Sequence, residues 1–121
     1  MSVLDFSVDT AELDGNAFIV TVSGEADMYT VPALEQALQG VVGLGGTSVV
    51  LDLAEVSFMD STGLSVLLRH DRTFRSLGGE LVIVADDRRL LRTLEITGLD
   101  RVLTIERKLA DGIAALNGSS G

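Results

Sequence analysis

The sequence contains no cysteine, and this absence removes several kinds of chemistry at once. Disulfide bonds, thiolate catalysis and cysteine-based zinc sites are all excluded. A chain without disulfides is typical of a reducing compartment, so a cytoplasmic location is expected. The first residues also lack a charged segment followed by a long apolar one, and no secretion signal is predicted.

Positive charge is scarce. The chain has nine Lys and Arg residues against 18 Asp and Glu residues, which gives a formal net charge of −9 at pH 7. Direct binding to nucleic acid is not expected, because a basic surface for phosphates is missing, and anionic membrane surfaces would repel the protein. No apolar run approaches the roughly 20 residues that cross a bilayer, so no membrane span is predicted. The same charge favours solubility and a basic protein partner.

The remaining composition is that of an ordinary globular domain. Hydrophobic residues make up 46% of the 121 residues and charged residues 22%. A chain of this length suits one domain with a single core. We expect that domain to span residues 1–117, with residues 118–121 as a flexible tail.

Strand and helix patterns alternate along the chain. Apolar residues alternate over residues 4–9, a turn signal follows at residues 14–16, and a second strand is predicted over residues 17–23. Strands are also predicted over residues 49–53, 81–85 and 102–105, and helices over residues 30–42, 61–77, 87–96 and 109–116, the last weakened by Gly112. The order β-β-α-β-α-β-α-β-α predicts an α/β fold. Its sheet is mixed and mostly parallel, with four to five strands, an N-terminal β-hairpin and about four helices.

The most informative stretch is Asp60-Ser61-Thr62-Gly63, which connects the strand at residues 49–53 to a helix. Its first three side chains can each cap a helix, so capping alone is the simplest interpretation. The alternative is that Ser61 accepts a phosphoryl group, because free backbone N–H groups at a helix N-terminus bind phosphate. Asp60 would repel such a phosphate. Its other possible roles are to accept a hydrogen bond from the serine hydroxyl and orient it, or to tie down the turn through backbone N–H groups.

A second polar segment, Gly24-Glu25-Ala26-Asp27, follows the strand at residues 17–23. If that strand is parallel to the one at residues 49–53, both loops lie at the carboxyl edge of the sheet, where ligands and partners bind. Glu25 and Asp27 are either solvated or part of a contact surface. Two carboxylates without further oxygens close by would hold a metal cation poorly, so no metal site is expected.

Catalysis is not predicted. The single histidine, His70, is expected to face solvent, and Asp71 to lie at the boundary of its helix's apolar stripe. Ser61 lacks the G-x-S-x-G elbow of a hydrolase, and more than about 10 Å of helix separates it from His70. The glycines at positions 43, 45 and 46 lack the Lys-Ser/Thr ending of a phosphate loop, so no cofactor is expected.

The segment from Phe58 to Leu64, which reads Phe-Met-Asp-Ser-Thr-Gly-Leu, resembles the STAS domain of bacterial anti-sigma factor antagonists. The segment Gly24–Asp27 is similar to the family's early G-E-x-D signature. The family's later L-x-x-x-G-L segment is similar to Leu90, Leu94, Gly98 and Leu99. The likeness covers about residues 3–116, in the same element order. Two residues depart from the family pattern: Ser65 replaces a glycine that is common in relatives, and Arg69 replaces a small residue, and either could change the choice of partner.

The resemblance implies a small α/β domain that switches between partners. Its unphosphorylated form binds an anti-sigma factor, itself a serine kinase, and so frees the sigma factor. The kinase phosphorylates the serine after the aspartate, here Ser61, with Thr62 as the second possible acceptor, and a serine phosphatase reverses the modification. The residues implied in partner contact are Glu25, Asp27, Tyr29, Thr30, Asp60, Ser61, Thr62 and Gly63.

Two other functions stay open from the sequence. STAS domains also serve as scaffolds in stress-signalling assemblies and as accessory subunits of lipid-transport complexes, where the serine turn is only structural. A small serine hydrolase that uses Ser61 is the alternative of another class.

Overall fold

The structure, a computed structural model, describes residues 6–119 of the chain. In this part of the chain, five strands form one sheet with the order β1-β2-β3-β4-β5. β1 is antiparallel to β2, and the pairs from β2 to β5 are parallel. The elements, in chain order, are β1 (Ser7–Glu12), β2 (Ala17–Ser23), α1 (Val31–Gly43), β3 (Ser48–Glu55), α2 (Ser61–Ser76), β4 (Leu81–Val84), α3 (Arg88–Ile96), the 3-10 helix η2 (Leu99–Arg101), β5 (Thr104–Glu106) and α4 (Leu109–Ser119).

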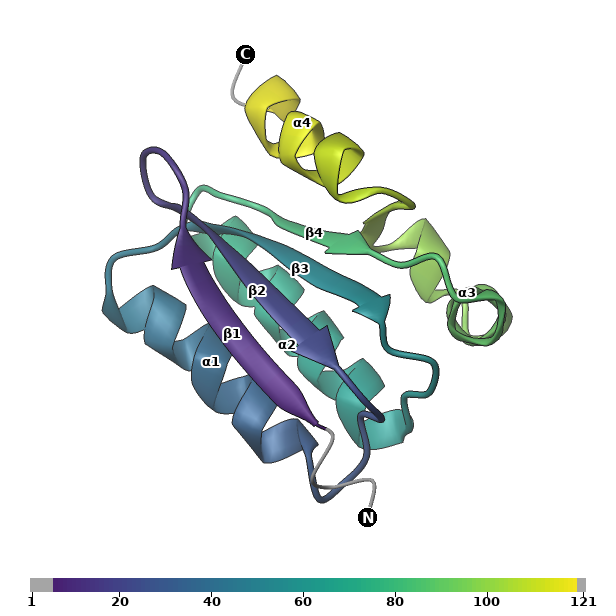
Figure 1. Cartoon of the computed structure of the whole chain (residues 1–121). Helices are drawn as coiled ribbons and strands as arrows, with labels where there is room; N and C mark the ends of the chain where they lie inside the picture. Colours follow the sequence, from purple (N-terminus) through teal and green to yellow (C-terminus); the bar gives the residue numbers. More distant parts are fainter. Residues whose placement is uncertain (1–5, 120–121) are drawn as a thin grey trace.

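Helices cover both faces of the sheet (Figure 1). α1 and α2 lie on one face, α4 lies on the other, and α3 lies beside the end of β4. The predicted α/β fold is confirmed, including the N-terminal hairpin, the mostly parallel sheet and the element order.

The burial of β3 follows from this arrangement. Val49, Val50, Leu51 and Leu53 are all fully buried, because successive side chains of a strand point to opposite faces and both faces are covered. Val49, Leu51 and Leu53 belong to the large core under α1 and α2. Val50 belongs to a smaller cluster with Val82, Val84 and Leu116, under α4.

Gly112 allows α4 to lie close to the sheet. A Cβ atom at this position would come within 2.6 Å of Val84 Cγ2 and 3.3 Å of Val50 Cγ1. Glycine lowers helix propensity, as the sequence predicts, but here it also removes a clash with the strands below.

Several element ends differ from the prediction. β1 covers Ser7–Glu12 rather than residues 4–9, of which 4 and 5 lie outside the described residues. β5 begins at Thr104 rather than 102, because Gly98, with a φ of 77°, leads into η2 and Leu103 donates to the Leu99 carbonyl at 2.8 Å. α4 covers Leu109–Ser119 rather than residues 109–116, and residues 120–121 of the predicted tail lie outside the described residues.

The prediction that His70 faces solvent is wrong. His70 is only 5% exposed, and its Nδ1 lies 3.0 Å from the Val66 carbonyl oxygen. Asp71, predicted at a boundary, is 3% exposed and pairs with Arg75 at 3.2 Å. Both residues continue the buried spacing of three and four residues that runs along α2.

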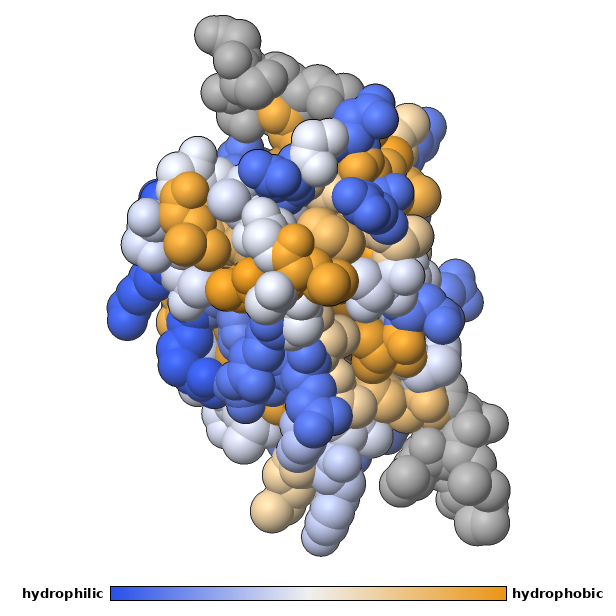
Figure 2. Space-filling view, turned by 90° about the vertical axis from the view of Figure 1, so that its left-hand side faces the viewer, coloured by the Kyte–Doolittle hydropathy of each residue, from blue (hydrophilic) through white to orange (hydrophobic). Residues whose placement is uncertain are grey.

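On the side away from α3, apolar residues adjoin one another over part of the surface and hydrophilic residues cover the rest (Figure 2). Among the described residues, no helix has the length and apolar character that a bilayer crossing requires.

Candidate functional site

The turn between β3 and α2 is organised by Asp60, the N-cap of α2. Its Oδ1 accepts hydrogen bonds from the backbone N–H of Thr62 at 3.0 Å and of Gly63 at 3.1 Å. The same oxygen accepts a hydrogen bond from the Thr62 hydroxyl. Asp60 therefore closes the helix end, which is the third of the roles considered from the sequence.

These hydrogen bonds also change the acidity of Asp60. The bond from the Thr62 hydroxyl is the largest influence and lowers the pKa of the Asp60 carboxyl, against a smaller rise from partial burial. The backbone amides of Gly63, Thr62 and Met28 lower this pKa further. The carboxylate is thus ionised at neutral pH and supplies negative charge at the positive end of α2.

Ser61 is the first residue of α2 and is exposed. Within the described part of the chain, its hydroxyl makes no hydrogen bond, whereas the Thr62 hydroxyl is held by Asp60. The prediction that the N–H groups of this helix end are free is wrong for Thr62 and Gly63, because Asp60 already occupies both. A phosphate on Ser61 would have to compete with the Asp60 carboxylate for them.

The loop between β2 and α1 lies beside this turn, as the parallel arrangement of β2 and β3 predicts. Ala26 N–H donates to the Phe58 carbonyl at 3.0 Å, and Asp60 N–H donates to the Ala26 carbonyl at 3.0 Å. Ala26 and Met59 form a parallel bridge. Gly63 is buried, and a Cβ atom there would collide with Met59, so its role is to let α2 approach the bridge.

Within that loop, Asp27 and Thr30 hold the backbone in place. Asp27 Oδ1 accepts from the N–H groups of Tyr29 at 2.9 Å and Thr30 at 3.1 Å. The Thr30 hydroxyl donates to the Glu25 carbonyl at 2.6 Å, and Thr30 is only 6% exposed. Thr30 precedes α1 but makes no side-chain cap bond, so it fixes the loop and offers little surface.

The exposed surface consists of Glu25, Ser61 and Thr62 with apolar side chains around them. Met28 is 62% exposed, Tyr29 76% and Phe58 48%. Met28 and Phe58 were not predicted, although apolar residues within polar loops are a recognisable signal of a contact surface.

Two residues on α2 depart from the pattern of the proteins that the sequence resembles. Ser65 is exposed one helical turn after Ser61, so both lie on the same face of α2. Arg69 forms an ion pair with Glu35 of α1. Arg69 therefore joins the two helices, and Ser65 extends the surface around Ser61.

The structure does not bring Ser61 and His70 together. His70 is buried on α2, nine residues after Ser61, which corresponds to about 13 Å along a helix. Among the described residues, no group of three or more His, Cys, Asp or Glu side chains could hold a metal ion.

Comparisons with known proteins agree with this geometry. The family described as the STAS domain matches residues 7–112. The chain is 37% identical over 103 residues to the anti-sigma-B factor antagonist of Listeria monocytogenes, covering 85% of this chain and 90% of that protein. It is 32% identical over 110 residues to the Bacillus subtilis antagonist of the same name, covering 91% and 99%. An anti-sigma factor antagonist from Mycobacterium paratuberculosis, with 35% identity, superposes with a TM-score of 0.81 over 93% of this chain and 94% of that one. The chain therefore belongs to the STAS-domain family, among its anti-sigma factor antagonists.

Proposed function

We propose that this protein is an anti-sigma factor antagonist controlled by phosphorylation of Ser61. The unphosphorylated surface around Ser61 binds a serine-kinase anti-sigma factor in the cytoplasm and so frees the sigma factor. Phosphorylation by that kinase ends the binding, and a serine phosphatase restores it. The protein itself performs no catalysis in this scheme.

The observation that carries the proposal is the difference between two neighbouring hydroxyls. Ser61 is exposed and its hydroxyl has no hydrogen-bond partner among the described residues, so a kinase can reach it. The Thr62 hydroxyl donates to Asp60 and would have to leave a charged acceptor before it could react. This contrast favours Ser61 over Thr62 as the acceptor.

The charge around Ser61 supports an effect on binding. A phosphoserine carries about −1.5 to −2 charges and would stand beside the ionised Asp60. Because Asp60 holds the N–H groups of Thr62 and Gly63, the phosphate is left to face the partner. A loss of about 3 kcal/mol in the binding free energy would lower the affinity more than a hundredfold.

The partner surface we propose comprises Glu25, Met28, Tyr29, Phe58, Ser61 and Thr62, which are exposed beside one another at the carboxyl edge. Asp27, Thr30, Asp60 and Gly63 support this surface from below through the contacts described above. Binding therefore depends on them indirectly.

The test has two stages. The immobilised protein is used to capture its partner from the producing organism, and the bound protein is identified by mass spectrometry. The purified partner is then incubated with ATP and either the wild type, Ser61→Ala or Thr62→Val, followed by intact mass measurement and peptide mapping. We expect one phosphate on the wild type and on Thr62→Val, and none on Ser61→Ala.

Other results would favour the alternatives. A captured anti-sigma factor that adds no phosphate to the wild type would support an unmodified scaffold. Esterase or phosphatase turnover that is lost in Ser61→Ala would support a hydrolase instead.

A further inference from the structure

The basic residues of this acidic chain are confined to one part of it. Residues 1–68 contain ten Asp and Glu residues and no Lys or Arg, so all nine basic residues lie between positions 69 and 108. Six of the nine lie between positions 88 and 108, on α3, on η2 and after β5. This segregation marks a region whose charge differs from that of the rest of the molecule.

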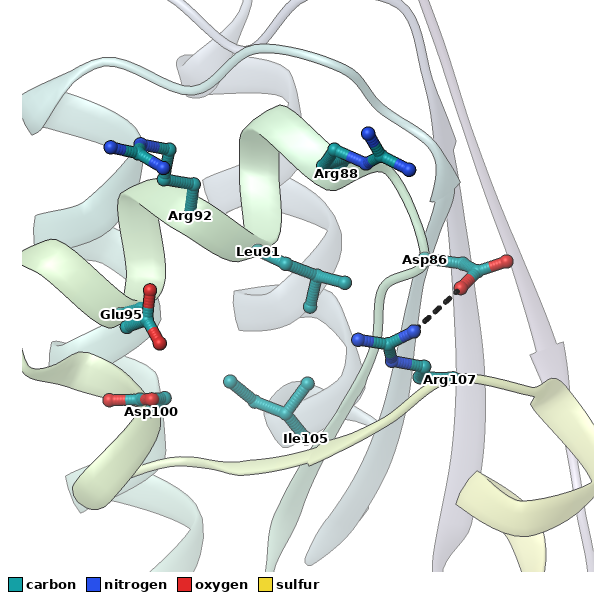
Figure 3. Close-up of a pocket in the computed structure, with 8 residues that line it drawn as sticks. All are labelled: Asp86, Arg88, Leu91, Arg92, Glu95, Asp100, Ile105 and Arg107. Carbon is teal, nitrogen blue, oxygen red and sulfur yellow. Dashed lines mark ion pairs between the residues drawn. The ribbon is translucent and has the colours of Figure 1, made fainter.

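A hollow of about 720 Å³ lies within this basic region, between α3 and β5 (Figure 3). Leu91 of α3 and Ile105 of β5 form an apolar middle. Arg88 and Arg107 lie at one end, where Arg107 is 4.0 Å from Asp86. The carboxylates of Glu95 and Asp100 lie at the other end, on the same side as the guanidinium group of Arg92. The hollow is therefore apolar in its middle, with two cations and one anion at one end and one cation and two anions at the other.

The hollow shares an edge of the sheet with the Ser61 turn. Asp86 follows β4 and Arg107 follows β5, where Ala85 N–H donates to the Glu106 carbonyl at 2.9 Å. Asp60 follows the adjacent parallel strand, β3. Since parallel strands end at the same edge, the hollow and the Ser61 turn lie along one edge of the sheet, where a single partner can reach both.

We propose that this hollow binds a charge-polarised segment of the partner protein. Carboxylates of the segment bind Arg88 and Arg107, since guanidinium groups form strong bidentate contacts with carboxylates. An apolar side chain covers Leu91 and Ile105, and a lysine or arginine approaches Glu95 and Asp100. The volume lies within the usual range of about 300 to 1,000 Å³ for binding pockets.

The opposite net charges of the two ends fix the direction in which the segment lies. A uniformly anionic ligand such as nucleic acid or a lipid surface gains no net attraction, because the three carboxylates of the lining balance its three guanidinium groups. The identification of the partner as an anti-sigma factor rests on the proposed function. The ability of the hollow to bind a charge-polarised peptide does not depend on that function, and it is tested separately.

The test uses the full chain, labelled with ¹⁵N, and a blocked hexapeptide of two glutamates, two leucines and two lysines in that order. We expect saturable changes in amide chemical shift confined to residues 86–92 and 104–107. The double variant Arg88→Glu/Arg107→Glu should weaken binding at least tenfold. Arg72→Glu/Arg89→Glu, which changes the net charge equally at exposed positions that do not line the hollow, should bind like the wild type.

Circular dichroism and urea unfolding verify that both variants remain folded. The proposal is overturned if no saturable shift occurs, if the shifts lie elsewhere, or if the two double variants lose affinity equally. It is also overturned if inorganic phosphate or free glutamate produces the same shifts, since the hollow would then bind small anions.

The captured anti-sigma factor provides a second measurement. Arg88→Glu/Arg107→Glu should lower its affinity more than Arg72→Glu/Arg89→Glu does, and equal losses in the two variants would overturn the role in partner binding. If no anti-sigma factor is captured but the peptide binds the hollow, the proposed function fails while the inference about the hollow's chemistry stands.

Discussion

The backbone N–H of Asp60 donates to the Ala26 carbonyl at 3.0 Å, so the turn before α2 is hydrogen-bonded directly to the loop before α1. Two segments more than 30 positions apart in sequence thus form one continuous edge. A protein that binds there contacts both segments together, and a change in either one alters the shape of the shared surface.

A negative charge at position 61 should lower the affinity for the partner and leave the stability of the fold nearly unchanged. Ser61→Ala should retain the partner and resist phosphorylation, whereas Ser61→Asp should bind at least about tenfold more weakly, a cost of about 1.4 kcal/mol. An acidic residue in the first turn of a helix is favourable, so Ser61→Asp should unfold within about 0.5 kcal/mol of the wild type. Isothermal titration with the captured partner and urea unfolding measure the two quantities. Equal affinities for both variants would show that charge at this turn is not the control.

The hydroxyl of Thr62 should control the acidity of Asp60. Thr62→Val removes the largest influence that lowers the pKa of Asp60, so this pKa should rise toward 3.8. Thr62→Ser keeps a hydroxyl at the same position and should leave the pKa low. Carboxyl ¹³C shifts followed through a pH titration report the value for each variant. An unchanged pKa in Thr62→Val would mean that the Thr62 hydroxyl bond is not made in solution.

The charge of Asp60 should stabilise the protein in a pH-dependent way. Because the folded-state pKa is lowered, this stabilisation is complete above about pH 3.8 and is lost as the pH falls through the folded-state value. Asp60→Asn keeps a capping oxygen but removes the charge, and should cost up to about 1 kcal/mol at pH 7. Urea unfolding of both proteins between pH 7 and pH 2.5 should show the difference narrowing at the acidic end.

Asp9→Asn, at an exposed position of β1, serves as the control for this pH series and should follow the wild type. A difference between Asp60→Asn and the wild type that stays constant over the whole range would contradict a role for the charge.

Two glycines in helices should respond to alanine with opposite signs. At Gly112 the new Cβ would lie 2.6 Å from Val84 Cγ2, so Gly112→Ala should destabilise the protein by about 1–3 kcal/mol. At Gly40 a new Cβ would meet no atom outside its own helix turn within 4 Å, so Gly40→Ala in α1 should stabilise the protein by up to about 1 kcal/mol. Urea unfolding measures both changes. A stable Gly112→Ala variant would mean that α4 can move away from the sheet at little cost.

The sequence was sufficient for the fold and for the neighbourhood of Ser61, because both follow from local rules. Apolar runs predict buried strands, and the loops that follow parallel strands lie at the same edge of the sheet. The adjacency of the loop that holds Glu25 and the turn that holds Ser61 could therefore be predicted from topology alone.

The hydrogen-bond partners of side chains and the burial of single residues were harder to predict from the sequence. Which hydroxyl Asp60 binds depends on angles within a single turn, and the sequence suggested that of Ser61, whereas the structure shows that of Thr62. The burial of His70 could have been found, because it continues the spacing from Val66 and Leu67 to Phe74, but its polarity favoured an exposed interpretation. The hollow beside α3 depends on residues from separate elements and has no signature in any one segment.

Asp60 supplies the negative charge at the start of α2 and accepts hydrogen bonds from the Thr62 and Gly63 N–H groups. Few backbone donors of the domain are therefore left to bind a second negative group. A phosphate ester on Ser61 would stay hydrated at the surface. The lifetime of the phosphorylated form would then depend on the rates of the kinase and the phosphatase, and not on the stability of the domain itself.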